Sequence, residues 1–147
     1  MRSVIVHLAE PCTEDDVAHV LARAYEGQGH RQWVEYAEGD TCLTIEFYRD
    51  HLTEYEPAEL EQLKFHFAGK TPLSVVAHIS GRHDGTAQAK RFVQLLLAKF
   101  PGVATDDFTD HMWSRFEIEQ NVLFDGLAFF DYRGFYERER LRPTDEG

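Results

Sequence analysis

The spacing of hydrophobic and polar residues along the chain changes between a strand pattern and a helix pattern. Runs rich in β-branched and aromatic residues predict strands at residues 3–9, 31–37, 41–48 and 73–80. Apolar residues three and four positions apart predict helices at residues 14–26, 57–68 and 86–100. Nearer the C-terminus we expect a strand at 103–104, a helix at 114–121 and a strand at 127–132.

Residues with strong local preferences mark the ends of these elements. Thr13 and Ser114 stand where helices begin, and their hydroxyl groups suit the free backbone N–H groups there. Pro57 suits the first turn of the helix that it opens. Glu38-Gly39-Asp40 is a turn signal between two strands, so residues 31–48 are expected to form a hairpin.

The order of the expected elements, β-α-β-β-α-β-α-β, contains two βαβ-like halves. It predicts the α+β class, with a mostly antiparallel sheet and helices packed on one face. A ferredoxin-like arrangement with insertions is one form that this order can take. A length of 147 residues favours one domain, residues 1–147, and we expect the charged tail after about residue 140 to fray.

The chain is acidic, with 26 Asp and Glu against 15 Lys and Arg and a net charge of −11. Such a charge repels nucleic acid and anionic lipid and attracts basic proteins. The arginines at 133, 138, 140 and 142 alternate with acids, which is typical of a solvated, salt-bridged helix. We therefore expect a protein partner, and we expect neither nucleic acid nor a membrane.

The N-terminal segment and the cysteines predict a cytoplasmic protein. No apolar run approaches the roughly 20 residues that span a bilayer. His7 and Glu10 interrupt what would otherwise resemble the apolar core of a signal peptide. Cys12 and Cys42 lack a paired spacing, so we expect reduced, structural thiols. Cys12 also precedes a helix, a position that would stabilise a thiolate.

Residues 106–136 combine a high density of aromatic residues with a high density of acids. Acidic side chains steer a basic partner toward a surface, and aromatic side chains anchor it there. We expect the phenylalanines of this segment to fill the core, namely Phe116, Phe124, Phe129, Phe130 and Phe135. Trp and Tyr carry a polar atom that favours the surface. The predicted partner-binding residues are Asp106, Asp107, Asp110, Trp113, Glu117, Asp131, Tyr132 and Tyr136.

The acids at 106, 107 and 110 also lie close to His111, which raises the question of a metal ion. Their spacing matches neither a calcium-binding loop nor the His-Glu-x-x-His pattern of zinc enzymes. The chain contains no motif for another cofactor either. We therefore expect no metal site and no cofactor.

The polar turn at residues 80–85 is the best candidate for catalysis. Arg82, His83 and Asp84 are adjacent there and are side chains of the kinds that transfer protons. The chain lacks a nucleophile elbow and a phosphate-binding glycine loop, so we expect no catalytic residues. A small α+β enzyme that uses His83, Asp84 and His111 remains an alternative.

Four stretches of the C-terminal half carry a further signal: residues 75–85, 100–107, 111–118 and 129–136, of which the last three combine aromatic and acidic residues. In this texture the chain resembles small acidic immunity proteins of bacterial toxin systems. The resemblance implies a cytosolic protein of bacterial competition that binds a cognate toxin domain and blocks its active site or substrate groove. It carries over no site residue position by position.

The sequence thus predicts a non-enzymatic immunity protein that neutralises a basic toxin domain through an acidic and aromatic surface. Two alternatives stay open beside it. One is the small enzyme described above. The other is a homodimeric structural or regulatory domain, in which the aromatic residues pack against a second copy. A monomer and a homodimer are both compatible with the pattern.

Overall fold

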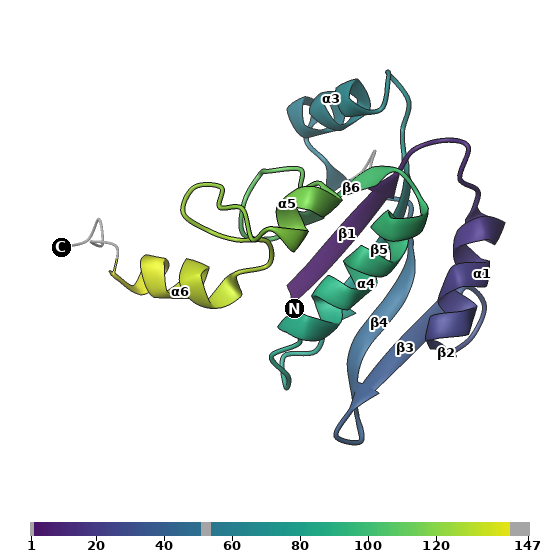
Figure 1. Ribbon diagram of the computed structural model, residues 1–147, viewed down its shortest axis with the longest axis horizontal. Helices are drawn as coiled ribbons and strands as arrows, with labels where there is room; N and C mark the ends of the chain where they lie inside the picture. Colours follow the sequence, from purple (N-terminus) through teal and green to yellow (C-terminus); the bar gives the residue numbers. More distant parts are fainter. Residues whose placement is uncertain (1, 51–53, 142–147) are drawn as a thin grey trace.

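Figure 1 shows the computed structural model, which describes residues 2–50 and 54–141. The described residues form one six-stranded sheet in the order β2-β3-β4-β5-β1-β6. Every neighbouring pair of strands in the sheet is antiparallel. The strands are β1 (Arg2–Leu8), β2 (Glu26–Gly27), β3 (Gln32–Ala37), β4 (Asp40–Tyr48), β5 (Leu73–Ile79) and β6 (Gly102–Asp106).

Helices cover both faces of this sheet. Within the described residues they are α1 (Glu14–Ala24), α3 (Pro57–His66), α4 (Thr86–Lys99), α5 (Arg115–Glu119) and α6 (Tyr132–Leu141). Figure 1 shows α1 and α4 over the same face of the sheet, with α3 at one end and α6 extending from the side. The two faces differ because successive side chains of a strand point to opposite sides.

Strand β1 shows this alternation. Val4 and Val6 are fully buried and belong to the main core, which α1 and α4 cover. His7 is also fully buried but points to the opposite face, where its Nε2 lies 3.4 Å from the hydroxyl oxygen of Tyr55. Tyr55 stands just before α3, so α3 packs on the face away from α1 and α4. The prediction that helices share one face therefore describes α1 and α4 and does not extend to α3.

The strand directions define the topology. β5 and β6 are both antiparallel to β1, so they are parallel to each other, with β1 between them. Helix α4 connects β5 to β6, which makes a split βαβ unit. The second βαβ half of a ferredoxin-like fold does not form, because α1 leads to β2 at the far edge of the sheet. The predicted α+β class with an antiparallel sheet is confirmed.

The predicted helix starts and the hairpin are confirmed in atomic detail. The hydroxyl of Thr13 accepts the N–H of Asp16, and the carboxylate of Asp16 accepts the N–H of Thr13, which completes a capping box. Glu38 and Gly39 have φ angles of 54° and 82°, as expected for a two-residue turn that matches the twist of its strands. The short edge strand β2 was not predicted from the sequence.

Residues 108–130 close the core along the outer edge of β6. The backbone N–H and carbonyl groups of Trp113 pair with those of Ala104 at 2.7 and 2.8 Å. The side chains of Trp113, Phe129 and Phe130 are each at most 2% exposed and pack in the main core. This irregular segment therefore takes the place of another strand at the sheet edge.

The strand predicted at residues 127–132 is wrong. Phe130 has a positive φ of 55°, which is incompatible with an extended strand. Asp131 then begins α6, since its Oδ1 accepts the N–H of Gly134 at 3.0 Å and its carbonyl accepts the N–H of Phe135 at 3.1 Å. The local cap at Asp131 thus outweighs the strand preference of the aromatic run.

Two further sequence predictions concern the C-terminal tail and a membrane. The tail that we expected to fray corresponds mainly to residues 142–147, which lie outside the described residues. Each helix in the described part of the chain is too short or too polar to cross a membrane.

Candidate functional site

Trp113 does not lie at the surface, so the prediction that it contacts a partner is wrong. Its side chain is 0% exposed and packs edge-on against Phe129, with ring centres 6.0 Å apart. Its indole nitrogen has no hydrogen-bond partner among the described residues. The sheet edge requires a large apolar group at this position, and that requirement outweighs the preference of the indole N–H for water.

Asp106 is a structural carboxylate rather than a steering charge. It is largely buried, and it accepts the backbone N–H groups of Phe108, Thr109 and Phe130 at 3.1, 3.2 and 2.7 Å. Burial raises the pKa of Asp106 above its ordinary value, although these three hydrogen bonds oppose the shift. The prediction that it is an exposed contact residue is therefore wrong, and its role is to hold residues 106–130 together.

Glu117 and Asp131 are half-buried, and both cap helices. Glu117 Oε1 accepts the N–H of Ser114 at 2.9 Å, and its Oε2 lies 2.9 Å from Nε2 of His111. Burial on its own would raise the pKa of Glu117, but the hydrogen bonds from Ser114 and His111 bring it below the ordinary value. Asp131 caps α6 as described above. Each carboxylate is thus already engaged within the fold.

The expectation that all five phenylalanines fill the core is wrong for two of them. Phe129 and Phe130 are buried as expected, but Phe116 is 66% exposed and Phe124 is 41% exposed. The ring of Phe124 stacks on His111, with centres 4.6 Å apart and planes 15° apart. Phe116 lies on α5, which is only five residues long and buries Ile118 instead.

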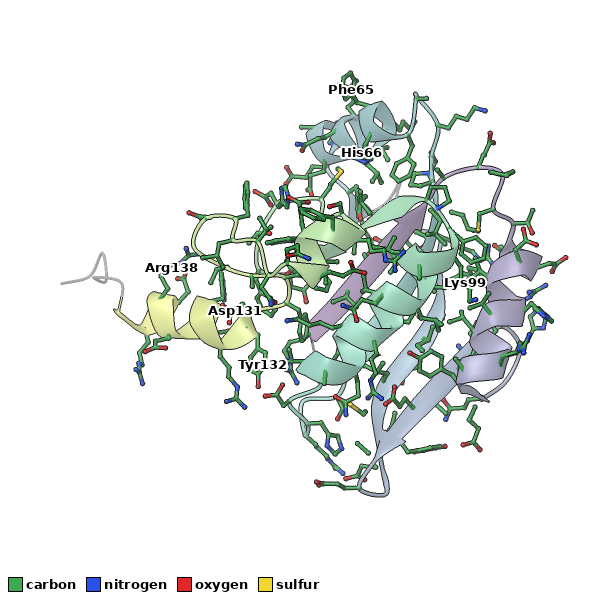
Figure 2. The ribbon with its side chains drawn as sticks, in the orientation of Figure 1. Phe65, His66, Lys99, Asp131, Tyr132 and Arg138 are labelled. Carbon is green, nitrogen blue, oxygen red and sulfur yellow. The ribbon has the colours of Figure 1, made fainter. Side chains whose placement is uncertain are left out.

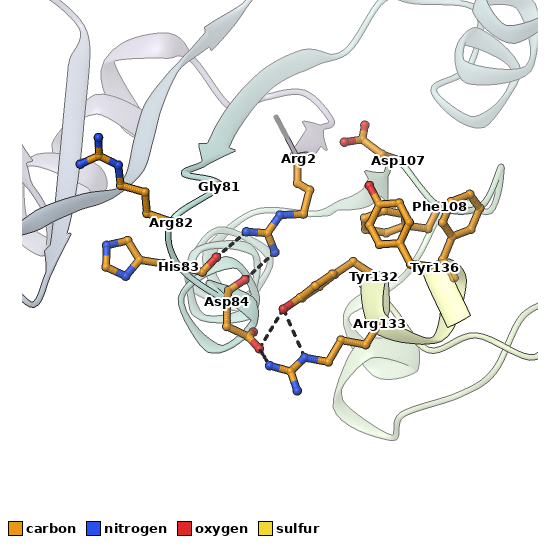
Figure 3. Close-up of a pocket in the computed structure, with 11 residues that line it drawn as sticks. Arg2, Gly81, Arg82, His83, Asp84, Asp107, Phe108, Tyr132, Arg133 and Tyr136 are labelled. Carbon is orange, nitrogen blue, oxygen red and sulfur yellow. Dashed lines mark hydrogen bonds and ion pairs between the residues drawn. The ribbon is translucent and has the colours of Figure 1, made fainter. Parts of the chain in front are cut away.

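Tyr132 and Tyr136 lie beside the 80–85 turn, across an open cavity of about 590 Å³. We call this cavity the clamp groove (Figure 3). The turn, strand β1, the end of β6 and α6 all contribute to it, through Arg2, Gly81, Arg82, His83, Asp84, Asp107, Phe108, Tyr132, Arg133, Phe135 and Tyr136. The clamp groove brings three predicted contact residues, at 107, 132 and 136, next to the turn that we considered for catalysis.

The polar groups at the centre of the clamp groove bind one another. The hydroxyl of Tyr132 donates to Oδ2 of Asp84 at 3.0 Å, and the guanidinium of Arg133 donates to the same oxygen at 2.5 Å. Arg2 donates to the backbone carbonyls of Asp84 and Ser80 at 2.6 and 3.0 Å, and lies 4.4 Å from the ring centre of Tyr132. Through these contacts α6 packs against the 80–85 turn and the start of β1, as Figure 3 shows.

The residues of the enzyme alternative do not converge in the clamp groove. His83 and Asp84 line it, but His111 lies elsewhere, between Trp113 and Phe124. Hydrogen bonds to Asp84, first from Thr86 and then from Tyr132 and Arg133, lower its pKa to about 2. A carboxylate with so low a pKa is a weak proton acceptor at neutral pH.

Cys12 does not have the thiolate character that a helix start would favour. Burial, and after it the charge of Asp16, raises the pKa of the Cys12 thiol to about 11. Burial also raises the pKa of Cys42. Both thiols are therefore protonated at neutral pH, and a protonated thiol is a poor nucleophile.

A second cavity, of about 520 Å³, lies between α3 and residues 105–112. We call it the acidic groove, because five carboxylate residues line it: Glu56, Glu59, Asp106, Asp107 and Asp110. Apart from Asp106 they are exposed. The three aspartates were predicted from the sequence, but the glutamates at the start of α3 were not. The signal there was the spacing of Glu56 and Glu59, which puts both on one face of a helix.

Buried polar groups form the floor of the acidic groove. His7 Nδ1 lies 2.7 Å from Oγ of Ser74, and its Nε2 lies 3.3 Å from Oγ1 of Thr105. Burial, and after it the charge of Glu59, raises the pKa of Tyr55 to about 12. The floor is thus polar and neutral at Tyr55, and the charge of the groove resides in its carboxylates.

In the described part of the chain, the carboxylates of the acidic groove have no Lys or Arg partners, unlike eight carboxylates elsewhere. Among the described residues, no Lys or Arg lines this groove or forms an ion pair with any of its five acids. Elsewhere eight acids pair with Lys or Arg: Glu10, Glu14, Asp15, Glu35, Asp40, Asp84, Glu119 and Asp125. The acidic groove therefore brings four exposed carboxylates without Lys or Arg partners to one cavity.

The acidic groove does not have the geometry of a metal site. In the part of the chain that the structure describes, no group of three or more His, Cys, Asp or Glu side chains is arranged to hold a metal ion. Four exposed acids around one open cavity instead suit a ligand that brings several positive charges at larger spacing.

Comparison with known proteins gives no match: no family model, curated protein or solved structure is significantly similar to this chain.

Proposed function

We propose that this protein is a non-enzymatic immunity protein that binds a basic toxin domain at the acidic groove and blocks it. The observation that carries the proposal is the set of groove carboxylates without Lys or Arg partners. A basic partner would supply the missing counter-charges. The texture that the C-terminal half shares with immunity proteins supports the same conclusion.

Electrostatics explains why such a groove suits this role. A toxin that attacks nucleic acid needs a cationic surface to hold phosphate groups. Carboxylates on two facing walls present that surface with an alternative array of negative charges. The net charge of −11 adds a long-range attraction, which raises the rate of association.

The four exposed acids come from two separate parts of the chain, which gives the site a defined shape. Glu56 and Glu59 belong to the start of α3, and Asp107 and Asp110 follow the end of β6. Asp107 is held in place by the N–H of Ser3, which donates to its Oδ2 at 2.8 Å. Asp107 also lines the clamp groove, so a large partner at the acidic groove would reach Tyr136 as well.

Charge neutralisation tests the proposal. The double variant Asp107→Asn, Asp110→Asn removes two groove charges, and Glu26→Gln, Glu38→Gln removes two exposed charges outside the groove. We expect the groove variant to bind a basic toxin domain, sought among the products of the neighbouring genes, at least about tenfold more weakly and with a shallower salt dependence. The control variant should bind nearly as well as the unaltered protein.

The same variants should differ in cells. Cells that express the neighbouring toxin should survive with the unaltered protein or the control variant and should lose protection with the groove variant. Equal protection by the two double variants would remove the acidic groove from the interface. If the unaltered protein neither bound the toxin nor protected the cells, the immunity function itself would be rejected.

A further inference from the structure

We propose that helix α3 is the principal docking element, and that Phe65 is its apolar anchor for the basic partner. This inference rests on the proposed function and adds a hydrophobic contact to it. Phe65 lies outside the 106–136 segment and outside both grooves.

Helix α3 buries little of its surface within the fold. Of its ten residues only Leu63 is buried, whereas α4 buries five of its 14 residues. Phe65 is 89% exposed, the highest value among the large hydrophobic residues left exposed. A solvated helix gains nothing for its own stability from a phenylalanine in water. Packing within the chain therefore does not account for Phe65.

Phe65 does not line the acidic groove, but it lies on α3, the helix that forms one wall of the groove. Ala58 and Gln62 line this groove, and Phe65 follows them along the helix by seven and three positions. Residues at these spacings share one side of a helix. Figure 2 shows Phe65 pointing away from the body of the molecule, on the outer side of α3. A partner that fills the groove and rests against α3 would cover this ring.

Charge decides what kind of partner covers Phe65. Glu56 and Glu59 lie on the same helix without Lys or Arg partners in the described chain. A second copy of this chain would bring another net charge of −11 and would be repelled, as would an anionic membrane. The complementary surface is a basic protein with an apolar residue beside its cations.

The groove carboxylates and Phe65 would affect different rate constants, those of association and of dissociation. Charged groups at the groove accelerate encounter, and a desolvated aromatic anchor slows dissociation. Hot spots of binding are commonly such aromatic residues surrounded by weaker polar contacts.

Short peptides test the inference on the full-length protein. One probe is an arginine-rich peptide that also contains leucines, and the second has serine in place of every leucine. We expect both to bind in a salt-dependent way, and the leucine peptide to bind about tenfold more tightly. Phe65→Ser should remove this leucine advantage. Phe116→Ser, which alters another exposed ring, on α5, should preserve it.

Each outcome of this experiment has a distinct meaning. If the leucine peptide had no advantage, or if Phe116→Ser removed the advantage equally, Phe65 would not be the anchor, and the groove proposal would be untouched. If neither peptide bound the unaltered protein even at low salt, the groove proposal would fail together with this inference. Equal thermal melting of both variants would exclude misfolding, since both rings are exposed.

Discussion

A single largely buried carboxylate, Asp106, connects two backbone segments that have no regular pattern in the sequence, residues 108–109 and residue 130. Its two oxygens accept N–H groups from residues 108, 109 and 130. A donor left unsatisfied in the interior costs about 1–3 kcal/mol. We expect Asp106→Ala to lower the free energy of unfolding by about 2–4 kcal/mol. Urea denaturation measures the change.

The neighbouring Asp110 provides the control for this prediction. It is exposed, so Asp110→Asn should change stability by less than about 0.5 kcal/mol. If the two variants were equally stable, the bonds to Asp106 would contribute little, and the arrangement of residues 106–130 would depend on its aromatic packing alone.

At Asp84, hydrogen bonding makes stability depend on pH. Its pKa falls from 3.8 to about 2 on folding, because Thr86, Tyr132 and Arg133 donate to the ionised form. Its contribution is therefore fully present above about pH 4 and is lost as the pH falls through 2. The side chain is 44% exposed, so solvent screening limits this contribution to about 1 kcal/mol or less.

The variant Asp84→Asn should thus be less stable than the unaltered protein at pH 7 and should approach it in stability near pH 2. Thermal melting at several pH values measures this convergence. Asp40→Asn is a suitable control, because the oxygen of Asp40 lies 3.8 Å from Arg82 in a looser, exposed pair. A stability gap at Asp84 that did not change with pH would contradict the prediction.

At the scale of elements, regular periodicity was predictable and irregular packing was not. The strand at 73–80 and the helix at 86–100 have continuous apolar patterns, and both appear with nearly the expected bounds. Residues 108–130 have no period, because long-range bonds such as those of Asp106 set their shape. The start of α6 likewise depends on one capping residue, Asp131, rather than on a pattern.

Only one wall of the candidate site, the acidic groove, was predictable from the sequence, for the same reason. Asp107 and Asp110 are neighbours in sequence, so the sequence analysis grouped them. Their facing residues, Glu56 and Glu59, are about 50 positions away and meet them only because α3 packs on the His7 face of the sheet. Phe65 was overlooked because an apolar residue in a predicted helix is usually assigned to the core.

At the scale of the whole molecule, the distribution of charge matters more than its total. Eight of the described acids are paired with arginine or lysine, and exposed pairs of this kind contribute little to stability. The acidic groove brings four exposed acids without such partners to one cavity. We expect the net charge to attract a basic partner from a distance and the groove to give that partner a binding site.

Added salt should accordingly have opposite effects on the two modes of association that the sequence left open. Screening weakens the attraction between the acidic groove and a basic partner, but it also weakens the repulsion between two copies that each carry a charge of −11. We expect a monomer in sedimentation experiments at about 50 mM salt, where charges still interact over about 10 Å or more. A dimer that was stable at low salt would favour the homodimeric alternative. Partner binding that strengthened with salt would mean that the exposed aromatic rings, rather than the carboxylates, dominate the interface.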